Sequence, residues 1–111
     1  MAYKVKITRS AERDISDLIA YLKTTFGEST AKKGFASLRH AFGKLARFPE
    51  LGASIAELGD LSLPYHRSLV LPPHTRILYQ VAEEHKTIYI HIVCNTRQDF
   101  ESLCLKRLSR L

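Results

Sequence analysis

Two consecutive stretches of the sequence carry apolar residues at intervals of three and four, and they constrain the fold more than any other feature. Such spacing places the apolar side chains on one stripe of an α-helix. The first stripe consists of Ala11, Ile15, Leu18, Ile19, Leu22 and Phe26, and the second of Ala31, Phe35, Leu38, Phe42, Leu45 and Phe48. Gly27 separates the two stretches, and Pro49 ends the second because a helix cannot continue through a proline. The sequence therefore predicts a hairpin of two amphipathic helices joined by a very short turn.

Polar residues and glycines add detail to these two helices. Ser10 is suited to cap the first helix, and Asp14 lies in its first turn, where the helix dipole favours an acid. The second helix is expected to start near residue 29 or 30. Gly34 and Gly43 lie inside the second helix, and each costs about 1 kcal/mol relative to alanine. They either mark places of close packing or are exposed glycines that the helix tolerates.

Four segments have the composition and alternation of β-strands. Residues 3–8 alternate apolar and polar side chains, which is typical of a strand with one buried face. Three further strands are expected at 65–71, 75–82 and 87–94, bounded by turn residues. The last of these is largely apolar on both faces, so we expect it to lie centrally in the sheet.

The order of these elements predicts the fold class. Short connections between the last three strands imply an antiparallel meander. Residues 50–64 are expected to form a loop with a short helical turn, and residues 99–110 a final helix. The order β-α-α-β-β-β-α indicates an α+β fold, with an antiparallel β-sheet that carries the helical hairpin on one face and leaves the other open. The chain has 111 residues and is 45% hydrophobic, so we expect one domain over residues 1–111.

Composition narrows the class of partner and the cellular compartment. There is no apolar run long enough to span a membrane and no signal-peptide pattern, so we expect a cytoplasmic protein without a membrane partner. Cys94 and Cys104 lack metal-ligand spacing and are interpreted as reduced, buried side chains. No residue pattern predicts a metal site or a cofactor. Seventeen Lys and Arg against eleven Asp and Glu give a net charge of +6, which favours an acidic partner.

The C-terminal half resembles a known family of toxins. Arg76-Ile77-Leu78-Tyr79-Gln80-Val81 is followed by an acidic turn, an isoleucine-rich strand and Asn95-Thr96-Arg97-Gln98-Asp99. This combination is similar to the RelE/ParE toxin superfamily of type II toxin–antitoxin systems. The helical hairpin from Ser10 to Gly52 is similar to the N-terminal part of ParE-like members, so the resemblance covers nearly the whole chain and lies closer to the ParE branch.

The resemblance implies a small toxin that a cognate antitoxin holds inactive. ParE relatives poison DNA gyrase, whereas RelE relatives cleave mRNA in the ribosomal A site, and one fold supports both activities. We expect the antitoxin to present an acidic, amphipathic segment that lies in the groove between the helical hairpin and the sheet. Operator DNA would be reached only through the antitoxin.

Metal-free RNA cleavage would require a base, an acid and cations around the phosphate. Arg67, Arg76 and Arg97 are the candidate cations, and the resemblance places Arg76 and Arg97 at or near functional arginines of RelE toxins. His66 or His91 is the candidate base. Each of these side chains also has a structural interpretation, as a strand-edge charge or a hydrogen-bonded histidine.

Two departures from the RelE pattern weaken the nuclease hypothesis. No tyrosine follows Arg97 where RelE toxins use one, and Asn95 stands where many relatives carry a histidine. Asparagine cannot transfer a proton near neutral pH, so the proposed chemistry lacks a group at that position.

Three functional hypotheses follow from the sequence. The leading one is a ParE-like toxin that inhibits DNA gyrase by binding, with contacts from the last strand and helix; the candidate contact residues are Arg97, Lys106, Arg107 and Arg110. The second is a ribosome-dependent mRNA endonuclease. The third is a toxin-fold protein without activity that acts as an antitoxin-bound corepressor.

Overall fold

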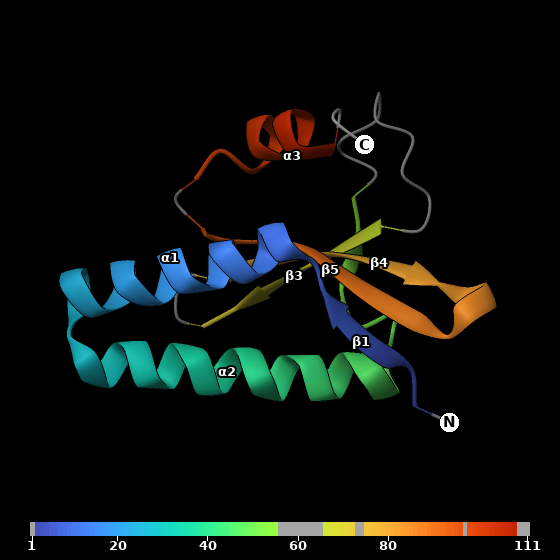
Figure 1. The fold of residues 1–111 in the computed structure, drawn as a ribbon, viewed down its shortest axis with the longest axis horizontal. Coiled ribbons are helices and arrows are strands. Elements are labelled where there is room, and N and C mark those ends of the chain that lie inside the picture. Colours follow the sequence, from blue (N-terminus) through green and yellow to red (C-terminus); the bar gives the residue numbers. More distant parts are fainter. Residues whose placement is uncertain (1, 56–65, 73–74, 97, 109–111) are drawn as a thin grey trace.

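The structure is a computed structural model that describes residues 2–55, 66–72, 75–96 and 98–108. Along the chain run β1 (Lys4–Ile7), α1 (Arg9–Phe26), α2 (Glu28–Arg47), β2 (Ala53–Ser54), β3 (His66–Leu71), β4 (Thr75–Ala82), the short 3-10 helix η2 (Glu83–His85), β5 (Thr87–Asn95) and α3 (Phe100–Leu108). The expected α+β class is confirmed. The helical hairpin of α1 and α2 covers one face of the sheet, and α3 lies over the other (Figure 1).

The five strands form one sheet in the order β1-β5-β4-β3-β2. The expected antiparallel meander of β3, β4 and β5 is confirmed, and β5 lies inside the sheet as its apolar composition predicts. β1 is different, because it pairs with β5 in parallel, with Val5 opposite Ile88. The sheet is therefore mixed. The helical hairpin carries the chain from β1 at one edge to β2 at the other, and the chain returns through β3 and β4 to β5 beside β1.

The helical hairpin begins and turns at local signals. Thr8, two residues before the expected Ser10, caps α1, and its Oγ1 accepts a hydrogen bond from the Ala11 amide at 3.2 Å. Gly27 has a φ of 97°, a conformation that favours glycine, and it alone separates α1 from α2. The very short turn is thus confirmed, and α2 starts at Glu28, slightly earlier than expected.

The two glycines inside α2 have different surroundings. A Cβ added at Gly34 would lie 2.7 Å from Cδ1 of Leu22, so Gly34 marks a close approach of the two helices. A Cβ added at Gly43 would meet no atom within 4 Å. Both interpretations that the sequence left open are therefore realised, one at each glycine.

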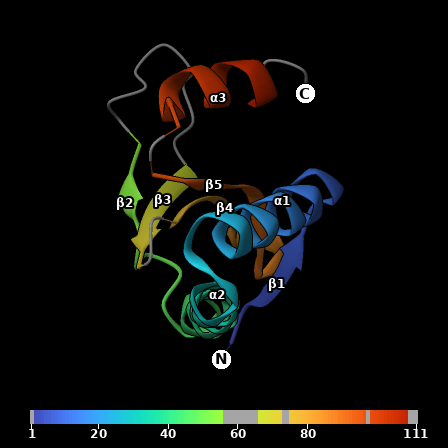
Figure 2. The same ribbon diagram turned by 90° about the vertical axis from the view of Figure 1, so that its left-hand side faces the viewer.

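Apolar side chains form a cluster on each face of the sheet. The larger cluster joins both hairpin helices to β1, β4 and β5 and includes Leu22, Leu38, Leu45, Ile77, Tyr79, Ile88 and Ile90. The smaller one lies under α3 and includes Ile55, Leu78, Ile92, Cys94, Phe100 and Cys104. The expectation of an open second face was therefore wrong for the part that α3 covers, because Phe100, Leu103 and Cys104 of that helix pack against the sheet. Figure 2 shows α3 on the side of the sheet opposite to α1 and α2.

The two cysteines behave as the sequence predicts. Both are free and buried, and both belong to the cluster under α3. Burial raises the pKa of the Cys94 thiol to about 11, so it stays protonated and unreactive at neutral pH.

Two expectations fall partly outside the described residues. The expected loop after α2 contains the short strand β2, which pairs with β3, and the helical turn expected before residue 64 lies in the undescribed segment 56–65. The last helix was expected over 99–110, and the structure describes it from Phe100 to Leu108.

Candidate functional site

The face of the sheet that carries α3 brings together most of the described candidate residues. α3 begins at a well-defined point because Asp99 caps it. The Asp99 carboxylate accepts hydrogen bonds from the Ser102 amide at 3.2 Å and the Ser102 hydroxyl at 2.8 Å. These bonds lower the pKa of Asp99. The cap places Phe100, the first residue of α3, directly against the sheet.

Arg76 on β4 lies beneath this first turn of α3. Its guanidinium carbon is 3.9 Å from the centre of the Phe100 ring, a close cation–π contact. One of its nitrogens lies 3.4 Å from the Ser68 hydroxyl on β3. The guanidinium is thus enclosed between a strand neighbour and α3 rather than extended into solvent.

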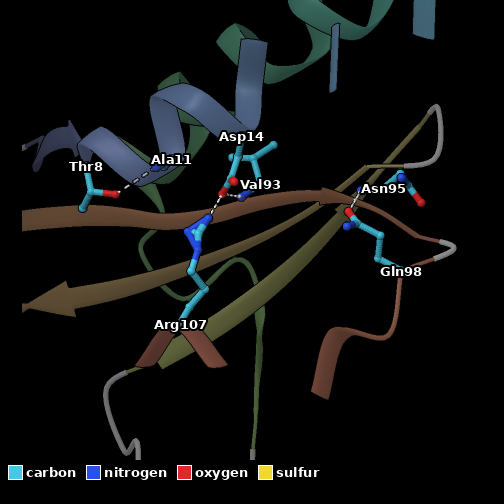
Figure 3. A network of polar contacts seen from close by, with 7 residues as sticks. All are labelled: Thr8, Ala11, Asp14, Val93, Asn95, Gln98 and Arg107. Atoms are coloured by element: carbon cyan, nitrogen blue, oxygen red, sulfur yellow. Dashed lines mark hydrogen bonds and ion pairs between the residues drawn. The ribbon is translucent and has the colours of Figure 1, made fainter. Parts of the chain in front are cut away.

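A second polar contact joins α3 to α1 and β5. The Asp14 carboxylate forms an ion pair with Arg107 on α3, and the same oxygen accepts a hydrogen bond from the Val93 amide at 3.1 Å (Figure 3). The side chains of Asp14 and Arg107 are 20% and 21% exposed. One carboxylate therefore connects the first helix, the central part of the sheet and the last helix.

His66 and His91 form a stacked pair on the same face. Their ring centres are 5.5 Å apart, with 21° between the planes, and Nε2 of His91 lies 2.9 Å from Oε1 of Gln80. Burial and the neighbouring His91 lower the pKa of His66 from 6.5 to about 4. Burial and the nearby Arg107 lower the pKa of His91. At neutral pH both rings are uncharged, so neither would attract a phosphate electrostatically.

Arg67 lies on the opposite face from Arg76. It pairs across the strands with Tyr79, whereas Arg76 pairs with Val70, and successive side chains of a strand alternate between faces. Arg67 donates a hydrogen bond to the Gly52 carbonyl at 2.8 Å. Arg67 therefore fastens the segment after α2 to the sheet.

Tyr79 holds the same segment from within the core. Its hydroxyl donates to the Pro49 carbonyl at 2.7 Å and accepts from the Gly52 amide at 2.8 Å. A Cβ added at Gly52 would lie 2.6 Å from the Ser68 carbonyl oxygen and 2.8 Å from the Tyr79 ring. Only glycine therefore fits at position 52 without a shift of the backbone.

Most of the chain matches the model of a known protein family. Residues 5–100 match the family model described as the ParE toxin of the type II toxin–antitoxin system parDE. The chain belongs to the ParE toxin family. No curated protein matches the chain.

Solved structures of ParE and RelE systems are similar to this ParE-family chain. The Mycobacterium tuberculosis toxin–antitoxin complex RelBE2 is 26% identical, with a TM-score of 0.60, and the match covers 86% of this chain and 99% of that one. The chromosomal ParDE system of Pseudomonas aeruginosa is 20% identical, with a TM-score of 0.65 and coverage of 85% and 96%. A mutant of the Escherichia coli toxin RelE in the free state is 15% identical, with a TM-score of 0.64 and coverage of 100% and 99%. These likenesses confirm the RelE/ParE fold.

The ParE-family fold brings some of the predicted site residues together and separates others. The side chains that gather on or reach the α3 face are His66, His91, Arg76 and Arg107. Arg67 faces the hairpin side, and Lys106 is exposed on α3. The candidates Arg97 and Arg110 lie outside the described residues.

Three residues of this site escaped the analysis of the sequence. Asp14 was interpreted only as an acid in a first helical turn, because its partner Arg107 is 93 positions away. Phe100 lies on the apolar side of the expected last helix, but its contact with Arg76 depends on how α3 folds back over the sheet. Gln80 gave no signal, since its role depends on lying beside His91.

The groove between the helical hairpin and the sheet differs in charge from what we expected. A hollow of about 210 Å³ lies there, between α1 and the end of β5, and Asp14 and Asp17 line it together with Leu18, Tyr21, Val93, Cys94, Asn95 and Gln98. Two carboxylates make this hollow a poor receptor for an acidic segment, even though Arg107 neutralises one of them.

The part of the chain that the structure describes contains no cluster of metal-binding side chains and no helix that could span a membrane. In residues 2–55, 66–72, 75–96 and 98–108, no three His, Cys, Asp or Glu side chains gather closely enough to hold a metal ion. Of the helices described, none has the length and apolar character required to cross a membrane.

Proposed function

We propose that this type II toxin arrests growth by binding and inhibiting DNA gyrase, without cutting RNA. The observation that carries the proposal is the separation of Arg67 and Arg76, which point to opposite faces of the sheet. A nuclease would need its cations around one phosphate. Membership of the ParE toxin family supports the same choice.

The histidines add to the case against RNA chemistry. A general base works best when its pKa lies near the working pH. His66, with a pKa of about 4, is a weak proton acceptor at neutral pH. The ring of His91 is already hydrogen-bonded to the side chain of Gln80. The guanidinium of Arg76 is stacked on Phe100, so it would have to leave that ring to reach a substrate.

The gyrase contact is assigned to the C-terminal part of the chain. Lys106 is exposed on α3, and the neighbouring Arg97 and Arg110 lie outside the described residues. Arg107, the fourth candidate, is paired with Asp14, and we assign it the role of positioning α3. The target surface would then be the outward side of α3 and the segments that flank it.

A cognate antitoxin would hold this toxin inactive in the cytoplasm. The similar systems from M. tuberculosis and P. aeruginosa, and the RelBE complex of E. coli, are described as toxin–antitoxin systems or complexes. This supports a protein partner for the present chain, with operator DNA contacted only through that partner.

Induced expression without an antitoxin tests the proposal in cells. We expect growth arrest with an SOS response, while mRNA stays intact. Codon-linked mRNA breaks that disappear in Arg76→Ala would instead establish a ribosome-dependent nuclease. Normal growth at a confirmed protein level would leave the corepressor hypothesis.

A further inference from the structure

The face of the sheet that carries α3 changes character one row beyond the residues that α3 covers. Leu78 of β4 and Ile92 of β5 pair with each other and belong to the apolar cluster under α3. In the next row on this face, Tyr89 of β5 pairs with Gln80 of β4, and Gln80 pairs with His66 of β3. Groups that can stack and form hydrogen bonds therefore replace the apolar cluster.

An irregularity in the pairing of β4 with β5 adds a second histidine to this row. The register shifts between Leu78 and Tyr79, which leaves His91 without a register partner on β4. Bulges of this kind re-aim side chains and recur beside functional sites. The centre of the His91 ring lies 5.5 Å from that of His66 and 6.4 Å from that of Tyr89. We call these three side chains the ring cluster.

The ring cluster is held in place by contacts within the fold. Nε2 of His91 lies 2.9 Å from Oε1 of Gln80, and the planes of the two histidine rings differ by 21°. His66 is buried, whereas His91 and Tyr89 are half-buried and keep part of their surface accessible. Side chains that are already ordered lose little freedom when a ligand stacks on them.

The neighbouring edge strand places positive charge beside these rings. Lys6 of β1 pairs with Tyr89, and Lys4 precedes it by two residues, so both lysines lie on the face of the ring cluster. Both are exposed, and among the residues that the structure describes neither takes part in an ion pair. A lysine on an edge strand also discourages pairing with another sheet. The rings beside these two lysines indicate a further role.

We propose that the ring cluster and the two lysines of β1 form a binding surface for single-stranded DNA. Unpaired bases would stack on Tyr89 and His91, and the phosphates would face Lys4 and Lys6. The proposal rests on the proposed function and deepens it, because DNA gyrase cuts DNA and holds the opened strands. A toxin bound to gyrase would then contact the DNA as well as the enzyme.

The chemistry of the surface favours a single strand over a duplex. Burial lowers the pKa of both histidines, so their rings are uncharged at neutral pH and the attraction for phosphate comes from the lysines. Aromatic rings bind unpaired bases by stacking with little regard to sequence. The bases of a duplex are already stacked on one another and present only their edges.

Binding of labelled oligonucleotides to the full-length chain tests the proposal. The probe is a single-stranded DNA of about 12 nucleotides, a common site size for such surfaces, and binding is followed by fluorescence anisotropy. The duplex and the RNA of the same sequence, and an abasic strand that keeps the phosphates, are measured beside it. We expect the single-stranded DNA to bind at least tenfold more tightly than the duplex or the abasic strand.

Substitutions of Tyr89 separate stacking from folding. Tyr89→Ile keeps a side chain suited to a strand but removes the ring, so it should weaken binding at least fivefold. Tyr89→Phe keeps the ring and should change the affinity less than twofold, and thermal unfolding checks that both variants are folded. The chain contains no tryptophan, so Tyr89→Trp introduces a single indole at the proposed site. Its fluorescence should be quenched by the single-stranded DNA and unchanged by the abasic strand.

Substitution of the β1 lysines tests the phosphate contacts. Affinity for a single strand falls with salt concentration, and each phosphate contact contributes about 0.7 to the slope of the double-logarithmic plot. Lys4→Gln with Lys6→Gln should therefore make this slope less steep by about 1.4. Lys32→Gln with Lys33→Gln makes the same change in net charge on exposed positions of α2 and should leave the slope unchanged.

The proposal is overturned if Tyr89→Ile binds the DNA as the unaltered chain does, or if both lysine pairs change the salt dependence equally. Equal affinity for the abasic strand or the duplex would also overturn it, because unpaired bases would then contribute nothing. Tighter binding of the RNA would overturn the choice of DNA. Failure of the unaltered chain to inhibit purified gyrase would reject the proposed target, whereas the oligonucleotide data by themselves decide the DNA surface.

Discussion

Tyr79 is the side chain on which the segment after α2 depends most directly. It is fully buried, and its hydroxyl contacts both the Pro49 carbonyl and the Gly52 amide. Burial raises the pKa of Tyr79, so the hydroxyl remains a hydrogen-bond donor throughout the neutral range. A phenol that donates and accepts inside the core couples the end of the helical hairpin to the centre of the sheet.

Replacing this phenol should lower stability by a measurable amount. Tyr79→Phe leaves the Gly52 amide without its partner, and an unsatisfied buried group costs about 1–3 kcal/mol. Urea unfolding would measure the loss in the free energy of unfolding. Tyr89→Phe is the control, because the hydroxyl of Tyr89 has no hydrogen-bond partner within the described residues. Equal stability of the two variants would refute the role given to Tyr79.

His66 makes stability depend on pH in a defined window. In the unfolded chain it binds a proton near pH 6.5, whereas in the folded chain it stays neutral down to about pH 4. The unfolded state therefore binds more protons between these values, and the free energy of unfolding falls as the pH falls through the window. The loss amounts to about 3 kcal/mol for a shift of this size.

His66→Phe isolates this contribution because it keeps an aromatic ring against His91 and cannot titrate. We expect the variant to lose less stability than the unaltered chain between pH 6.5 and pH 4, as followed by urea unfolding at several pH values. Parallel pH profiles for the two proteins would contradict the burial of a neutral His66.

In the part of the chain that the structure describes, two contacts of charged side chains attach the helix α3 to the rest of the fold. Phe100 covers Arg76 at its start, and Arg107 pairs with Asp14 near its end. The small apolar cluster that contains Cys94 and Cys104 adds to these two contacts. We therefore expect α3 to open before the rest of the sheet does.

Asp14→Asn tests this attachment because asparagine retains an oxygen for the Val93 amide and removes only the charge. A partly buried ion pair that is also hydrogen-bonded contributes about 1–2 kcal/mol. Hydrogen exchange of residues 100–108 should become faster by the corresponding factor, about five- to thirtyfold. Asp17→Asn, an exposed neighbour on α1, should leave that exchange unchanged. Unchanged exchange in Asp14→Asn would show that the ion pair with Arg107 does not hold α3 in place.

The helices and strands were largely predictable because their signals are local. Apolar periodicity located α1 and α2, and alternation located β3, β4 and β5, to within a few residues. The sequence predicts Ser10 as the cap of α1, whereas Thr8 caps it in the structure. Either hydroxyl is a suitable capping group, so the sequence does not distinguish them. The parallel pairing of β1 with β5 and the return of α3 over the sheet depend on contacts between residues far apart in sequence.

The candidate site was less predictable than the fold, for a related reason. Whether Arg67 and Arg76 share a face depends on the register of β3 against β4, and a shift of one residue reverses the face of every side chain. Residues 73–74, between the two strands in the sequence, lie outside the described part of the chain. The sequence could therefore indicate Arg67 and Arg76 as candidate site residues, but it could not show that they lie on opposite faces of the sheet.

The molecule as a whole presents three surfaces of different character. The α3 face carries the candidate target contacts, the hollow between α1 and β5 carries two carboxylates, and the outward side of α2 carries cations, among them Arg39 and Lys44, beside the exposed ring of Phe48. A net charge of +6 is thus distributed unevenly over these surfaces. This arrangement is consistent with a toxin that acts by binding.

Supercoiling by purified DNA gyrase in the presence of the full-length chain is the most direct test of the central claim. We expect supercoiling of relaxed plasmid to be inhibited in proportion to the added chain, while mRNA on translating ribosomes stays intact at the same concentration. Unaffected supercoiling at a large molar excess, together with cleavage of ribosome-bound mRNA, would contradict the account and assign the activity to the ribosome.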